Sequence, residues 1–583
     1  MSQMRRSVQF FWQLVICVLM SLLLTSCGGG GGSSSAGSTG STGTAGTDPP
    51  AMLPPQQGQE PEPTFSAVEV QAIIQAAVNS VNIPVVVAVT NRVGTPLGVY
   101  STLNAPTQGH GNFNQLVSAP DLAVALARTG AFFSNDQAPL SSRTVRFISG
   151  IHFPPGVAGT ANAALYGIEN TNRGCSFDAT FNPGQAVPPA TLINGTSPGL
   201  GIITGKANVF DSDSFAVNPG GMPIFENGIL VGGIGVVAYD ANGNDNYDAA
   251  EYAAFFGAGG LGGVITVDSN VFGVGFVPTK LPPGVVTING ITLPFVNNTS
   301  LPAGYSAGTP GAPLNGTFEV PPIASPRPTP YGYLVGPLAS AYPGGLSQQD
   351  VMDIVTSAYD TAMNTRAAIR LPINQPAKMM ISVSDLDGNF LAIYRMKDAT
   401  IFSIDVSAAK ARNVVYFSST GGQLPGDYAD PNPGSIDLPG VPPGTAVTNR
   451  TISEGAQPLF PPGIANTPNG PFFNVYTNDT ANACTQGSQP KNPHQNGIVF
   501  FPGALPLYRN GVMVGGLGVS GDGVDQDDFV TSGGAAEEIQ NNSSSPDQTG
   551  KGFEAPAAIR ADQVTIDGVR LPYIKFPRNP AFF

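Results

Sequence analysis

The sequence predicts an α+β protein built from two tandem copies of one unit, each an antiparallel sheet with helices packed on one face. The main observation is a repeat, because residues 223–236 return as 506–519 with their Gly and Pro residues in register. A second match joins residues 286–295 to 564–573. A repeat of this length indicates duplication of a whole folding unit, so a function must belong to one unit or to the contact between two.

Each copy opens with the pattern of an amphipathic helix. Apolar residues spaced three and four apart follow Ser66 in the first copy and Ser347 in the second. Both serines occupy the position expected for an N-cap. Apolar runs at 84–89 and 378–384 then predict strands, and the Asp-Gly-Asn turn at 387–389 predicts a hairpin into the next strand of the second copy.

A second helix and a closing hairpin complete the predicted unit. The helix is expected at 121–133 and again at 405–417. The hairpin is the repeated segment itself, which turns at Asn227-Gly228 and at Asn510-Gly511. Helix, hairpin, helix and further antiparallel strands together predict helices on one face of an antiparallel sheet.

The two copies are expected to span residues 64–303 and 345–583. Residues 304–344 lie between them and are rich in Pro, Gly and Ser. This composition predicts an extended linker with little packing of its own.

The N-terminal residues 1–26 have the order of a lipoprotein signal peptide, with basic residues, a short apolar run and then Leu-Thr-Ser before Cys27. The segment Leu24-Thr25-Ser26-Cys27 resembles the bacterial lipobox, whose Cys is diacylated and becomes the mature N-terminus. An uncleaved N-terminal anchor is the alternative. Residues 27–63 predict a flexible tether with a mean reach on the order of 30 Å.

These features predict a protein of the bacterial cell envelope that is anchored by lipid. Gly28 after the Cys resembles lipoproteins sent to an outer membrane, where the protein would face the periplasm or the surface. The chain has 25 Lys+Arg against 39 Asp+Glu, and no basic stripe that could neutralise phosphates. Nucleic acid is therefore not expected as a partner.

Cys175 and Cys484 occupy loosely corresponding positions in the loop-rich insertions of the two copies. In an oxidising compartment, a disulfide between them would join the copies. Two unrelated buried thiols are the alternative, and the sequence leaves both open.

Three motifs of the second copy point to a known family. They are Ala-Ala-Lys-Ala-Arg at 408–412, Pro-Leu-Tyr-Arg-Asn-Gly at 506–511 and Val-Gly-Gly-Leu-Gly-Val-Ser-Gly at 514–521. With them the copy resembles the GlcG/HbpS family of heme-binding domains, and the first copy resembles a more diverged member. The resemblance implies a domain that binds heme or a related tetrapyrrole in a groove or at a subunit interface. A fused pair would then form an internal pseudo-dimer, which could oligomerise further.

Heme would need an axial donor, and the chain has three His residues. None of His110, His152 and His494 is shared by both copies, which argues against a duplicated His-ligated site. For each of the three, the ordinary interpretation is an exposed or hydrogen-bonded loop residue. His152 is the first candidate for a ligand because its apolar flanks could line a slot. The absence of a Cys-x-x-Cys-His motif excludes covalent c-type heme.

A calcium loop is the second predicted cofactor site. Oxygen-bearing residues stand at EF-hand positions 1, 3, 5, 9 and 12, namely Asp240, Asn242, Asn244, Asp248 and Glu251. Position 6, where Gly makes the sharp turn, is Asp245, and a strand rather than a helix precedes the loop. A solvated polar turn is therefore the alternative.

The sequence favours a binding protein over an enzyme. Nothing in the sequence places a Ser with both a His and an acidic residue, so no catalytic residue is predicted. The expected function is a surface-tethered lipoprotein that binds heme or a related tetrapyrrole non-covalently. A redox or heme-degrading enzyme is one alternative, and a ligand-free structural or interaction module stabilised by calcium is another.

Overall fold

The structure is a computed structural model, and it describes residues 57–63, 66–185, 199–205, 216–259, 286–297, 300–326, 328–419, 438–487, 493–536, 552–577 and 580. All of these belong to one compact unit, Ala51–Phe583. The predicted signal peptide and Cys27 lie outside the described residues. Within the described ranges, no helix has both the length and the apolar character needed to cross a bilayer.

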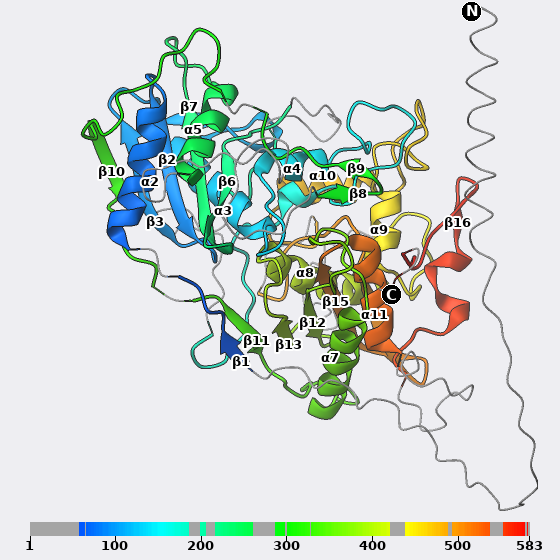
Figure 1. The fold of residues 1–583 in the computed structure, drawn as a ribbon. Coiled ribbons are helices and arrows are strands. Elements are labelled where there is room, and N and C mark those ends of the chain that lie inside the picture. Colours follow the sequence, from blue (N-terminus) through cyan, green and yellow to red (C-terminus); the bar gives the residue numbers. More distant parts are fainter. Residues whose placement is uncertain are drawn as a thin grey trace, which may run out of the picture. The chain divides into compact units, whose positions relative to one another are not determined.

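Two antiparallel sheets form the centre of the fold (Figure 1). The first has the order β10 (Gly316–Val320), β3 (Pro96–Thr102), β2 (Val85–Asn91), β7 (Ile229–Ala238) and β6 (Gly221–Glu226). The second has the order β1 (Gln57–Gln59), β11 (Pro330–Val335), β13 (Phe390–Arg395), β12 (Met379–Ser384), β15 (Val512–Gly521) and β14 (Ala504–Arg509). Four strands of each sheet have the same order, β3-β2-β7-β6 in the first and β13-β12-β15-β14 in the second, whereas the edge strand β10 follows the other strands of its sheet in the chain and β11 precedes β13 to β15. We call each sheet with its helices the first and the second module.

The main helices also correspond between the modules. The first module has α2 (Ala67–Ser80), α3 (Ala119–Phe133), α4 (Ser142–Phe147) and α5 (Tyr247–Gly259). The second has α7 (Gln348–Met363), α8 (Phe402–Ser418), α9 (Asn449–Gly455) and α11 (Val524–Ala535), together with α10 (Phe473–Ala481). The structure also has short hairpins, formed by β4 (Gln108–His110) with β5 (Leu116–Ser118), β8 (Thr287–Ile288) with β9 (Ile291–Thr292), and β16 (Thr565–Ile566) with β17 (Val569–Arg570).

The predicted local signals are confirmed where the structure describes them. Ser66 and Ser347 cap α2 and α7, and each forms a capping box with the acidic residue three positions later. Asn227 and Asn510 have φ of 54° and 53°, and each is followed by a Gly with positive φ. Such a pair gives the tight turn that joins two antiparallel strands.

The helices cover both faces of each sheet, so the prediction of a single covered face is wrong. In β2, Val87 packs with α2 and α5 on one side, whereas Ala88 packs with α3 on the other. Every residue of β2 is buried. A strand buried on both faces reads as a continuous apolar run instead of an alternating one, as this strand does.

Glycines allow α3 and α8 to lie very close to their sheets. A Cβ at Gly235 would clash with the carbonyl oxygen of Ala123 in α3, and one at Gly518 would clash with that of Ser407 in α8. The glycines of the repeated strand therefore allow close backbone contact between sheet and helix.

The predicted linker and part of the tether are also structured. Strand β10 pairs with β3, and β11 pairs with both β13 and β1, so residues from 304–344 extend both sheets. Sheet edges carry unpaired backbone groups that an extended segment can satisfy without an apolar core of its own. For this reason, a Pro- and Gly-rich composition did not prevent strand formation.

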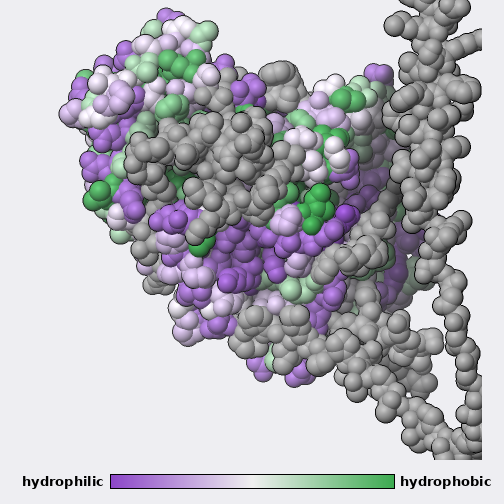
Figure 2. All heavy atoms as spheres, viewed as in Figure 1, coloured by the Kyte–Doolittle hydropathy of each residue, from purple (hydrophilic) through white to green (hydrophobic). Residues whose placement is uncertain are grey.

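The two modules share contacts within this compact unit. The rings of Phe133 and Phe402 stack with centroids 4.1 Å apart. Cys175 and Cys484 form a disulfide between positions that are 309 residues apart in the chain. On the face shown in Figure 2, hydrophilic residues gather in the central part and apolar residues lie in small scattered groups.

Candidate ligand-binding site

The two modules are built on matching buried ion pairs. In the first module, Arg143 of α4 binds Glu251 of α5, with Nε 2.6 Å from Oε1 and Nη2 3.2 Å from Oε2. In the second, Arg450 of α9 binds Asp528 of α11, with Nε 2.5 Å from Oδ2. These pairs hold α4 and α9 against the helices that begin after β7 and β15.

A second matching contact anchors the long helix of each module to a hairpin turn. Nε of Arg128 donates to the carbonyl oxygen of Gly94 at 2.9 Å, and Nε of Arg412 donates to that of Gly388 at 2.8 Å. Burial lowers the pKa of Arg128 to about 10 and that of Arg412 to about 9. Both guanidinium groups therefore remain charged at neutral pH.

A cavity of about 480 Å³ is lined by residues of both modules. Its volume falls within the range of small-molecule sites. Ile148 and Phe153 line it from the segment after α4, and Ile288 lines it from β8. The other apolar lining residues are Ala161, Ala163 and Ala164 of the first module and Pro461, Pro462, Pro502 and Val524 of the second.

Charged groups lie along the second module's side of this cavity. Asp525 accepts from Nη2 of Arg450 at 2.6 Å and from Nζ of Lys575 at 3.0 Å. Burial raises the pKa of Glu454, and Arg450 lowers it again in part. The cavity thus combines an apolar wall with two basic groups and two half-buried carboxyls.

His152 lies beside the cavity, not in its lining. Its Nδ1 is 2.9 Å from the carbonyl oxygen of Thr160. A carbonyl can only accept, so Nδ1 carries the proton and Nε2 keeps a lone pair. The next residue, Phe153, does line the cavity. Among the described lining residues, none is His, Cys, Met or Tyr.

The other two His residues lie elsewhere. Nδ1 of His110 is 2.6 Å from Oδ2 of Asp245, on the short hairpin of β4. Nε2 of His494 is 3.8 Å from Oδ2 of Asp178. The structure therefore brings no two His residues to one site.

The structure does not support the predicted calcium loop. The Glu251 side chain is buried and binds Arg143, so its carboxylate is turned away from the loop. Asp240 accepts from the backbone N–H groups of Asn242 and Asn244 at 2.8 and 2.9 Å, which closes a local polar turn. Asp248 stands in the first turn of α5. Over the part of the chain that the structure describes, no three His, Cys, Asp or Glu residues gather as metal ligands.

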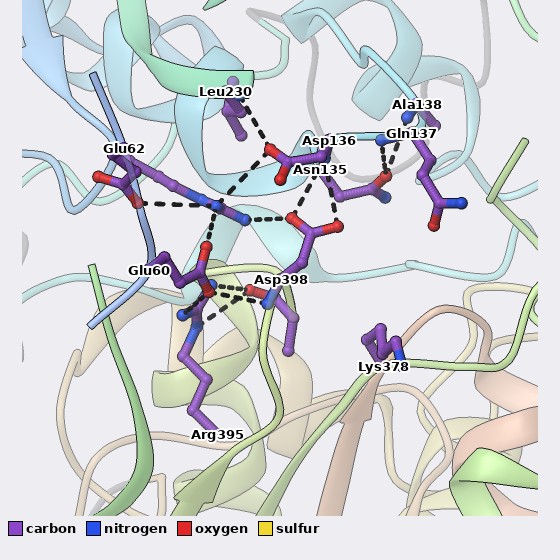
Figure 3. A network of polar contacts seen from close by, with 12 residues as sticks. Glu60, Glu62, Asn135, Asp136, Gln137, Ala138, Leu230, Lys378, Arg395 and Asp398 are labelled. Atoms are coloured by element: carbon purple, nitrogen blue, oxygen red, sulfur yellow. Dashed lines mark hydrogen bonds and ion pairs between the residues drawn. The ribbon is translucent and has the colours of Figure 1, made fainter. Parts of the chain in front are cut away.

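A buried ionic network joins the modules near β1 (Figure 3). Glu60 accepts from Nη1 of Arg92 and from Nη1 of Arg395, each at 2.5 Å. Asp398 accepts from Nη2 of Arg92 and from Nη1 of Arg370, each at 2.6 Å. These residues were not singled out in the sequence, because they come from separate segments and no spacing connects them.

The comparisons with known proteins concern mainly the second module. Residues 348–536 match the family model described as haem degrading protein HbpS-like. This HbpS-like segment includes Arg450, Glu454 and Asp525 of the cavity lining. No curated protein matches the chain.

Two solved structures resemble part of the chain. One is described as the PduOC:heme complex, with 18% identity, a TM-score of 0.20, and coverage of 33% of this chain and 92% of that chain. The other is Klebsiella pneumoniae protein ORFY, of family model DUF336, with 18% identity, a TM-score of 0.20, and coverage of 32% and 85%.

Proposed function

We propose that this protein binds heme or a related tetrapyrrole non-covalently in the cavity shared by the two modules. The observation that carries the proposal is the HbpS-like match over residues 348–536. That segment supplies one wall of the cavity, and the first module supplies the other.

The lining suits a tetrapyrrole in size and in character. Phe153 and Ile148 offer an apolar surface for the face of a planar ring, and Lys575 and Arg450, which pair with Asp525 here, are the basic groups that its carboxylates would engage. The lining itself holds no axial ligand, so His152 is the candidate donor through Nε2. When bound, heme would supply a redox-active iron centre.

Two further parts of the proposal concern organisation. We take residues 64–303 as a diverged second HbpS-like copy, and the shared strand order and the matching pairs of Arg143 and Arg450 support this. We also take Cys27 as a lipid anchor that tethers the protein in the cell envelope. A mass spectrum of the N-terminal peptide tests the anchor, because Cys27→Ser would abolish both processing at this position and acylation.

A heme titration of the chain from Gln57 onward tests the binding proposal. We expect a shifted Soret band that saturates, and we expect Ala164→Trp, which fills the cavity, to abolish it. Lys575→Ala should weaken binding several-fold, because it removes one exposed cation from the carboxylates. The matched control is Lys397→Ala, an exposed Lys that does not line the cavity.

The axial ligand has its own test. His152→Ala should move the Soret band of the bound heme, whereas His494→Ala, outside the cavity, should leave it unchanged. If circular dichroism shows that the protein is folded but its heme titration does not saturate, heme binding is rejected and the ligand-free module is favoured.

Heme degradation is a second candidate, and the description of the matching family favours it. Bound heme incubated with a reductant and oxygen separates the two functions. Loss of the Soret band with release of a linear tetrapyrrole would indicate an enzyme, and a stable band would indicate a carrier.

A further inference from the structure

The second module contains a buried Lys–Asp pair at its centre. Nζ of Lys410 in α8 is 3.0 Å from Oδ2 of Asp527 in α11, and the two side chains are 0% and 2% exposed. The same Nζ donates to the carbonyl oxygen of Val519 at 2.8 Å and lies 4.8 Å from the ring centroid of Phe501. Asp527 Oδ1 is buried without a hydrogen-bond partner among the described residues.

The first module shows that the fold does not need this ion pair. Arg128 and Arg412 make the same contact in their modules and therefore correspond to each other. Lys410 stands two positions before Arg412, and Leu126 of α3 stands two positions before Arg128, so Leu126 corresponds to Lys410. Glu251 pairs with Arg143 in the way that Asp528 pairs with Arg450, so Glu251 and Asp528 correspond. The residues just before them, Ala250 and Asp527, therefore correspond as well. An apolar pair therefore occupies the corresponding place in the first module.

The buried surroundings favour the neutral forms of both groups. Burial lowers the pKa of Lys410, although Asp527 opposes this shift. Burial also raises the pKa of Asp527 to about 7, against the effect of Lys410. Burial therefore favours the neutral amine and the protonated carboxyl over the charged forms, since charges are costly in such an environment.

The backbone closes around the pair. A Cβ at Gly503 would lie 2.6 Å from Cβ of Asp527 and 2.7 Å from Nζ of Lys410, so a larger residue cannot stand there. Water has little access to a carbon and a nitrogen held in such a space. An amide formed there would be protected from hydrolysis.

We propose that Lys410 and Asp527 form an intramolecular isopeptide bond between Nζ and Cγ. The Nζ lone pair attacks Cγ of the protonated carboxyl, and an N–C bond forms. The C–OH bond then breaks, and the hydroxyl leaves as water with a proton taken from the nitrogen. The reaction needs no oxidant and no cofactor.

The bond would join α8 to α11 across β15 and close the second module covalently. Together with the Cys175–Cys484 disulfide, it would give the chain two cross-links. One of them would survive reduction. This property is independent of tetrapyrrole binding, and its test does not involve a ligand.

Peptide mapping of the full chain tests the bond. The protein is reduced, denatured, labelled with an amine reagent and digested. We expect a branched peptide containing Lys410 and Asp527, lighter by one water molecule than the sum of its two linear parts. A linear peptide with a labelled Lys410 side chain would overturn the proposal.

The matched control is the double variant Lys410→Leu/Asp527→Ala, which copies the apolar pair of the first module. We expect it to fold and to lack the branched peptide, and to lose the wild-type resistance to unfolding under reducing conditions. The wild-type peptide map decides the proposal even if the variant does not fold.

Discussion

The substitution Asp398→Asn is expected to cost the protein about 3–5 kcal/mol of unfolding free energy at pH 7, the usual effect of removing one partner from a buried ionic network. The Asp398 carboxylate joins Arg92 of the first module to Arg370 of the second, and its side chain is 13% exposed. The Asn amide has nearly the same shape but no charge. Two buried guanidinium groups would lose a common partner.

The pKa of Asp398 gives a second estimate of this magnitude. Burial raises the pKa, but Arg370 and Arg92 outweigh it and hold the value to about 2, below the ordinary 3.8. At about 1.4 kcal/mol per pKa unit, this difference corresponds to about 2 kcal/mol of stability. Because the folded pKa is depressed, the stabilisation is present above the unfolded value of 3.8 and is lost as the pH falls through about 2.

Urea denaturation of both forms at pH 7, 5 and 3 is the assay. We expect the unfolding free energies of the two forms to differ by the same amount at pH 7 and pH 5. The difference should be smaller at pH 3, because at this pH Asp398 takes up a proton on unfolding. Asp353→Asn, on the exposed side of α7, is the control and should change stability by less than about 0.5 kcal/mol. A loss below about 1 kcal/mol for Asp398→Asn would refute the reasoning, because the network would then not hold the modules together.

Three more predictions concern other parts of the fold. Burial and the nearby Asp398 raise the pKa of Asp136 to about 6. The folded state therefore gains stability as the pH falls from above 6 toward 3.8, and Asp136→Asn should flatten this part of a urea-stability profile. Gly235→Ala should destabilise by about 1–3 kcal/mol through the clash with α3, whereas Gly552→Ala, with open space around its Cβ, should change the melting temperature little. Replacing Cys175 and Cys484 by Ser should cost about 2–5 kcal/mol, and an equal midpoint with and without reductant in the wild type would contradict this.

Local signals in the sequence predicted most of the elements. Ser66 and Ser347 are helix caps, and Asn227 and Asn510 are hairpin turns, because each requires only neighbouring backbone groups. The repeat predicted that the two modules share a strand order. The continuous apolar sequence of β2 also indicated that both faces of the sheet are covered, but the prediction of a sheet covered on one face did not use it.

The candidate site was less accessible from the sequence. His152 was chosen for its apolar flanks, and the structure places it beside the cavity whereas Phe153 lies in the lining. The spacing of the loop residues predicted Glu251 as a calcium ligand, but in the structure its carboxylate forms an ion pair with Arg143. The spacing of residues in a loop cannot show whether a distant Arg folds onto one of them.

The sequence by itself predicted two similar modules and the positions at which their helices and turns begin. It did so because periodicity, caps and turn residues act over a few positions of the chain. Only the tertiary structure decided how the modules meet, through Glu60, Asp398 and the cavity between Phe153 and Arg450. Those contacts join residues that are hundreds of positions apart, and their strength depends on a shared burial that no local pattern records.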